Sequence, residues 1–229
     1  MKKVLVMLTL LVLTITTVSA KQRYVIMDFL HSADISSPYL KQDATKYNQS
    51  CGPTSTAFIY NYYIYKNSNG KYVAFKNKNK AKWAIRKLYK HIGQTLNSTM
   101  GTFDPLVQIG AGKYDFQKVE QRSMQNSLNT NLTYLVNDMK NKIPAIISLK
   151  GYNNGEGRNK HRYHSLNPIG KFNHIVIVFG YEKQNSNSFS NSDKIFYYDP
   201  YFGKNHYMTL GELKRVANQD NMDYLRFGK

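Results

Sequence analysis

The spacing of apolar residues changes along this chain, and the change limits the folds open to it. In three stretches, at 53–66, 78–92 and 130–140, apolar residues recur at steps of three and four, as in amphipathic helices. From residue 143 onward, short apolar runs separated by polar loops replace this spacing, and such runs are typical of strands. Helices followed by sequential strands predict an α+β domain with an antiparallel sheet.

Within this pattern, three helices precede the strands. Pro53 suits the first position of a helix because its missing N–H is not needed there, and NSNG at 67–70 ends that helix. The other two helices are expected at 78–92 and 130–140. Residues 21–50 are expected to form a short strand followed by a polar loop. The predicted later strands and closing helix are 143–149, 172–181, 194–203, 206–210 and 211–217.

Residues 1–20 have the pattern of a secretory signal peptide. Two lysines follow Met1, an apolar run extends to Val18, and small residues precede a cleavage site after Ala20. The apolar run is short for a membrane span, which needs about 20 residues. We therefore expect a secreted or periplasmic protein whose mature chain, residues 21–229, is a single domain without a transmembrane segment.

The chain is strongly basic. Its formal net charge is +18, of which residues 1–20 contribute +2, so residues 21–229 carry +16. Such an excess favours anionic partners, among them anionic envelope polymers. The lysines are scattered among Asn, Tyr and Ser instead of forming a dense run, so no specific nucleic-acid partner is predicted. The simplest alternative is a solvated basic surface without a ligand.

Cys51 is the only cysteine of the chain, so no disulfide can form within it. It stands directly before Gly52 and Pro53, at the expected start of a helix. The positive end of the helix dipole favours the thiolate form of a cysteine at this position. Gly52 leaves room for a substrate carbonyl beside backbone N–H groups. The alternative is that Cys51 is an unreactive, buried small residue.

A nucleophile of this kind needs a base and a group that orients the base. Among six histidines, His174 stands at the mouth of the most apolar predicted strand. If residues 172–182 and 194–199 form a hairpin, His174 falls opposite Asp199, where facing residues lie about 5 Å apart. Asp199 would then accept a hydrogen bond from the imidazole. The alternative role of Asp199 is to begin a turn at Pro200.

No metal site or cofactor is predicted. His161 and His164 form an H-x-x-H pair, but they lie in a polar loop without a helical pattern or an evident third ligand. The GAGK segment at 110–113 lacks the spacing and the following Ser or Thr of a phosphate-binding loop. The candidate chemistry therefore rests on side chains alone.

Four segments of the sequence resemble the papain-like cysteine peptidases. The closer resemblance is to the family of the double-glycine peptidases that trim bacteriocin leader peptides. The segments are CGPTSTAFIYNYY, NKIPAIISL, FNHIVIVFGY and IFYYDPYFGKNHYMTLGEL. The resemblance implies a papain-like fold, in which an N-terminal helix carrying the nucleophile packs on a C-terminal antiparallel sheet. Residues 66–128 match no part of the pattern and are expected to be an insertion.

The resemblance also implies roles for individual residues. Cys51 would attack the carbonyl, His174 would move the proton, and Asp199 would hold the imidazole. The family stabilises the oxyanion with a glutamine before the cysteine. Gln42, in KQDA, resembles that position with a longer loop, and Gln49 is the rival candidate; papain-type spacing would put the glutamine at position 45, where this chain has Thr.

Three functions are compatible with these features. The first is an exported peptidase or amide hydrolase that cleaves through a thioester with a Cys-His-Asp triad, acting on a peptide or another amide-containing substrate. The second is a cell-wall amidase or an acyltransferase toxin that uses the same three residues. The third is a basic binding protein that keeps the fold without catalysis. Fold similarity does not choose among them, because the cleft and not the scaffold sets function.

Overall fold

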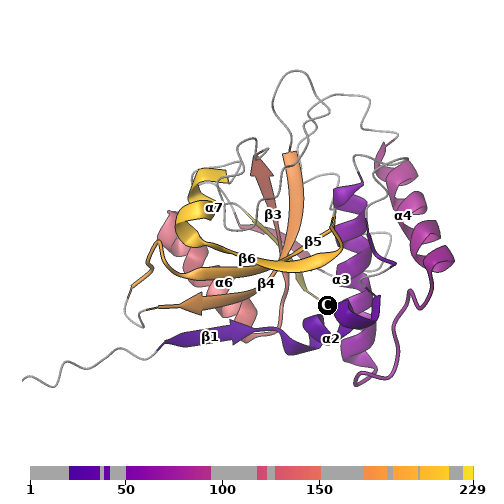
Figure 1. Ribbon diagram of the computed structural model, residues 1–229, viewed down its shortest axis with the longest axis horizontal. Coiled ribbons are helices and arrows are strands. Elements are labelled where there is room, and N and C mark those ends of the chain that lie inside the picture. Colours follow the sequence, from indigo (N-terminus) through magenta and orange to yellow (C-terminus); the bar gives the residue numbers. More distant parts are fainter. Residues whose placement is uncertain are drawn as a thin grey trace, which may run out of the picture.

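An antiparallel sheet with helices packed against it organises the computed structural model (Figure 1). The structure describes residues 21–36, 39–41, 50–93, 118–122, 127–150, 173–184, 188–200, 202–216 and 224–228. The strands are β1 (Gln22–Val25), β2 (Lys118–Arg122), β3 (Ala145–Lys150), β4 (Asn173–Lys183), β5 (Lys194–Asp199), β6 (Lys204–Thr209) and β7 (Tyr224–Gly228). The helices are α2 (Met27–Ser36), α3 (Cys51–Asn67), α4 (Lys78–Gly93), α6 (Leu128–Lys140) and α7 (Leu210–Val216). Helices together with an antiparallel sheet confirm the predicted α+β class.

Strand β4 lies at the centre of the sheet. The strand order is β2-β7-β3-β4-β5-β6, and every pair is antiparallel. Strand β3 pairs with the first half of β4, and β1 pairs with its last four residues, from Gly180 to Lys183. A side chain on Gly180 would lie 3.0 Å from Val25 and 3.2 Å from Phe196, so only glycine lets β1 and β5 approach β4 here.

Helix α3 stands at one end of the strands, with α4 on its outer side (Figure 1). Most of α3 is buried, and Phe58 packs on Tyr198 of β5 with ring centroids 4.2 Å apart. At its first turn, a side chain on Gly52 would lie 3.4 Å from Ile175 Cδ1, so the start of α3 packs closely against β4. None of the helices in the described ranges is long and apolar enough to cross a membrane.

The segment after β1 differs from the prediction. Residues 27–36, expected to begin in a strand and continue as a polar loop, form the helix α2. Phe29 is buried and stacks on Phe179 of β4 with centroids 5.0 Å apart, and it also contacts Phe58 at 4.9 Å. Packing of this one aromatic residue on two distant elements stabilises a helix that Ser and Asp disfavour locally. Strands β2 and β7 were not predicted either.

The turn between β4 and β5 is held by a buried carboxylate. Asp193 is fully buried and accepts hydrogen bonds from the Tyr181 hydroxyl at 2.8 Å, from Gln184 N at 2.9 Å and from Ser190 N at 3.0 Å. Three donors converging on one side chain fix the length of the connection. The hairpin register, and with it the relation of His174 to Asp199, depends on that length.

Asp193→Ala should lower the free energy of unfolding by about 2–4 kcal/mol, because it leaves three donors without their charged acceptor. Asp34→Ala, which removes an exposed carboxylate from α2, is the control and should change stability by less than about 0.5 kcal/mol. Urea unfolding followed by circular dichroism measures both. Equal effects of the two substitutions would contradict the structural role of Asp193.

Candidate active site

Cys51 is the first residue of α3 and is 7 % exposed. The helix therefore begins two residues before the predicted start at Pro53. Thr54 N donates to Ser50 O at 2.8 Å, which closes the first turn, and Pro53 needs no acceptor. The sulfur thus sits at the positive end of a helix of 17 residues, where an anion is stabilised.

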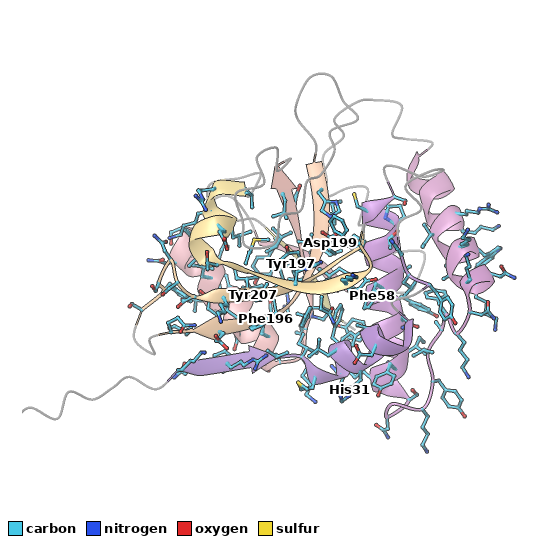
Figure 2. The ribbon with its side chains drawn as sticks, in the orientation of Figure 1. His31, Phe58, Phe196, Tyr197, Asp199 and Tyr207 are labelled. Atoms are coloured by element: carbon cyan, nitrogen blue, oxygen red, sulfur yellow. The ribbon has the colours of Figure 1, made fainter. Side chains whose placement is uncertain are left out.

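His174 lies on β4, where it pairs with Leu149 of β3, and its side chain is fully buried. Its Nε2 atom is 2.9 Å from Oδ1 of Asp199, the last residue of β5, which is also fully buried. Figure 2 shows Asp199 at the end of its strand, beside the upper part of α3. The structure therefore brings together the histidine and the carboxylate that the sequence pairs.

A symmetrical hairpin would place His174 directly opposite Asp199. In the structure, the two residues do not face each other directly. The ladder pairs Ile177 with Tyr198, so its next step places Val176 opposite Asp199. His174 is two residues farther along and reaches Asp199 diagonally, a distance that a long side chain spans. An offset of two residues keeps both side chains on one face of the sheet, which is why the predicted contact forms despite the wrong register.

The side chain of Cys51 lies beside the ring of His174 and contributes to the raised pKa of the imidazole. Because Nε2 faces Asp199, Nδ1 is the ring nitrogen that remains for the thiol. The start of α3 and the start of β4 are held together beside this contact by the close packing of Gly52 on Ile175. Cys51, His174 and Asp199 thus form one chain of contacts between a helix terminus and the sheet.

The protonation of His174 follows from these neighbours. Burial by itself lowers the pKa of the imidazole, but the charge of Asp199, its hydrogen bond and the contact with Cys51 outweigh burial and raise the pKa to about 10. The imidazolium is therefore the favoured form near neutral pH. The ring then carries its positive charge between a carboxylate and a sulfur atom.

Asp199 performs both of the roles that the sequence left open. Its side chain contacts His174, while its backbone carbonyl accepts a hydrogen bond from Gly203 N at 2.8 Å. Gly203 has φ +65°, a conformation that glycine adopts without strain, and this turn leads into β6. The turn fixes the end of β5 and thereby the position of the carboxylate.

A contact that sequence reasoning missed lies next to Asp199. Tyr198 is fully buried, and its hydroxyl donates to Leu40 O at 2.8 Å. The side chain of Lys41 lies against Gly203, where an added Cβ would meet it at 3.4 Å. Residues 40 and 41 are thus held against the turn that follows Asp199. The run of aromatic residues before Asp199 is the sequence signal that hinted at such packing.

Several predicted features lie outside the described residues. They are the signal peptide at 1–20, the oxyanion candidates Gln42 and Gln49, and the histidine pair His161 and His164. Within the described ranges, no group of three His, Cys, Asp or Glu side chains is arranged to hold a metal ion. The described site offers a thiol, an imidazole and a carboxylate.

Comparison with known proteins assigns a family to the chain. The sequence model described as the Peptidase_C39 like family matches residues 35–229, which include all three residues of the site. No curated protein matches the chain. The match confirms the resemblance seen in the sequence, and it supports a cysteine peptidase-like function on a papain-like α+β fold. The chain belongs to the Peptidase_C39 like family.

Proposed function

We propose that this protein is an exported cysteine peptidase or amide hydrolase that cleaves its substrate through a thioester on Cys51. The observation that carries the proposal is the continuous contact from Cys51 through His174 to Asp199, with a raised pKa on the central ring. A structural ion pair has no need of a thiol beside it, whereas a thiol nucleophile is activated by an adjacent base. The signal-like pattern of residues 1–20 supports export.

The chemistry proceeds in two halves. The Cys51 thiolate attacks the amide carbonyl, and the oxyanion forms beside the backbone N–H groups at the start of α3. The His174 imidazolium then donates its proton to the departing amine as the C–N bond breaks, which leaves a thioester on Cys51. Next, neutral His174 takes a proton from water, the resulting hydroxide attacks the thioester, and the thiolate and imidazolium are restored.

Asp199 acts on His174 and not on the substrate. It accepts a hydrogen bond from Nε2, which directs Nδ1 toward the sulfur, and its charge stabilises the imidazolium. We assign Gln42 as the side chain that donates to the oxyanion. Support comes from the packing of Leu40 and Lys41 against Tyr198 and Gly203, because Gln42 follows them directly in the chain.

Alkylation of Cys51 by iodoacetamide tests the thiolate. At pH 7, we expect the wild type to react at least about tenfold faster than His174→Ala, because the imidazolium assists the attacking sulfur as its counter-ion. Equal rates in the two proteins would refute the pairing of Cys51 with His174.

Substitution of Asp199 by Asn tests its charge separately from its shape. The amide can still accept a hydrogen bond from Nε2, but it no longer raises the pKa of His174. The alkaline limit of kcat/KM should therefore move to lower pH, with a fall of about 10²–10⁴ in kcat. Asp199→Ala should lose activity at every pH. An unchanged alkaline limit in Asp199→Asn would show that Asp199 only shapes the turn.

Substrate class separates peptidase action from the alternatives. We expect the wild type to cleave casein-derived peptides and Cys51→Ala to be inactive on them with an unchanged circular dichroism spectrum. Purified cell-wall fragments are the comparison substrate, and mass spectrometry of the products measures both. Turnover of wall fragments alone would indicate an amidase, and binding without turnover by the wild type would indicate a non-catalytic protein.

A further inference from the structure

One stretch of the described chain carries many cations and no carboxylate. The sequence has no acidic residue between Asp43 and Asp104, and the α3–α4 loop and the first half of α4 fall within this stretch. Six exposed residues there form what we call the basic ridge: Lys71, Tyr72, Lys76, Lys80, Trp83 and Lys87. No acid within this stretch offsets their charge, so the ridge attracts an anion.

The packing of α4 determines which side chains form the ridge. Ala81, Ala84 and Ile85 are buried, and α4 packs against α3. Lys80, Trp83 and Lys87 follow one another at steps of three and four residues, so they share the face of α4 that points away from α3. The apolar side of α4 is buried in the core. On the opposite side, Lys80 and Lys87 flank the exposed ring of Trp83.

Two large rings remain exposed on the ridge, although burial would be favourable for both. Tyr72 and Trp83 are each 60 % exposed. The ammonium group of Lys76 lies 5.6 Å from the centre of the Tyr72 ring, and that of Lys87 lies 5.6 Å from the centre of the Trp83 ring. Exposed aromatic rings beside cations give the ridge apolar contact area next to its positive charges.

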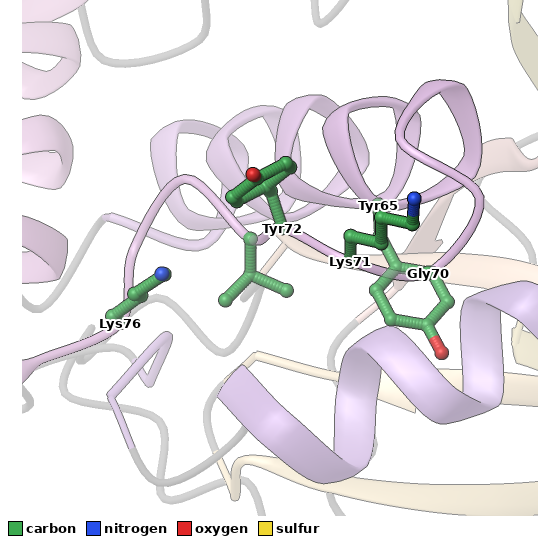
Figure 3. Close-up of a pocket in the computed structure, with 6 residues that line it drawn as sticks. Tyr65, Gly70, Lys71, Tyr72 and Lys76 are labelled. Atoms are coloured by element: carbon green, nitrogen blue, oxygen red, sulfur yellow. The ribbon is translucent and has the colours of Figure 1, made fainter.

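A hollow lies at the loop end of the ridge. Its volume is about 290 Å³, and Tyr65, Gly70, Lys71, Tyr72 and Lys76 contribute to its wall. Figure 3 shows Tyr72 between Lys76 on one side and Lys71 on the other. Gly70 has φ +78°, and a side chain there would meet the Tyr65 hydroxyl at 3.1 Å, so glycine keeps this turn tight. Two lysines, Lys71 and Lys76, thus line the hollow.

We propose that the basic ridge binds a flexible anionic polymer whose repeating unit is a small polyol joined by phosphodiesters, the chemistry of an envelope polymer. Each lysine ammonium group acts as a point charge that attracts phosphate, and it does not distinguish one nucleotide base from another. The spacing of cations over the loop and α4 suits a linear chain with one charge per short unit. This surface lies on other elements than Cys51, His174 and Asp199, so the inference does not depend on the proposed function.

Two other anionic partners fit the ridge less well. Single-stranded nucleic acid binds by stacking its bases on open ring faces, but here an ammonium group lies over one face of each ring. A bilayer would have to take up the two rings together with the ammonium groups that cover them, which is costly in hydrocarbon. A polyol phosphate needs neither open ring faces for stacking nor burial of the ammonium groups. Its charges pair with the lysines, and its aliphatic units contact the ring edges.

Titration of the full chain with poly(glycerol phosphate) tests the proposal. Trp83 is the only tryptophan, so its fluorescence reports contact with the ridge directly. We expect a saturable change in emission, and calorimetry should give an affinity that falls steeply as salt rises. Lys76→Gln with Lys87→Gln should weaken binding about tenfold. Hydrolysis of a small peptide by this double variant should be unchanged.

The matched control is Lys140→Gln with Lys214→Gln, which removes the same charge from exposed positions on α6 and α7. It should change the affinity by less than about twofold. Equal weakening in both double variants, or no change in Trp83 emission, would overturn the proposal. So would binding of a single-stranded oligonucleotide of matched charge, or of anionic phospholipid vesicles, at least as tight as that of poly(glycerol phosphate).

Discussion

The buried hydrogen bond between His174 and Asp199 is the contact on which the account of this protein depends. Both side chains are fully buried, and a charged pair in such a place is costly unless the two groups satisfy each other. The fold keeps the two groups in contact by fixing the ends of the strands that carry them, β4 and β5. Gly203 holds the backbone of Asp199, and the packing of α3 on β4 brings the Cys51 thiol to the other side of the ring.

The surroundings of this contact explain why so many aromatic residues are needed. Phe58 of α3 packs on Tyr198, the neighbour of Asp199, and Phe29 of α2 joins Phe58 to β4. These rings set the position of the helix relative to the strands, and thus the position of the sulfur relative to the imidazole. The thiol, the base and the carboxylate come from three elements, so their geometry is a property of the whole core.

Local sequence pattern was sufficient for the elements that carry the site. The helix after Cys51, the strand after His174 and the strand before Asp199 each have a period or a turn signal of their own. Local sequence pattern was not sufficient for elements whose formation depends on contacts with residues far away in the chain. Helix α2 depends on Phe29 meeting Phe179, and β2 pairs with β7 about a hundred residues away. The hairpin register differs by two residues from the prediction, because it depends on a shift in the ladder between Val178 and Gly180 and on a turn ordered by the Asp193 side chain.

The central claim is that His174 is an imidazolium at neutral pH because Asp199 and Cys51 surround it. The most direct measurement is a pH titration of its ring nitrogens by NMR in the wild type and in Cys51→Ala. We predict that both nitrogens are protonated at pH 7 in the wild type and that the pKa falls in Cys51→Ala, since Cys51 contributes to the rise. A ring that is neutral at pH 7, with the same pKa in both proteins, would contradict the account.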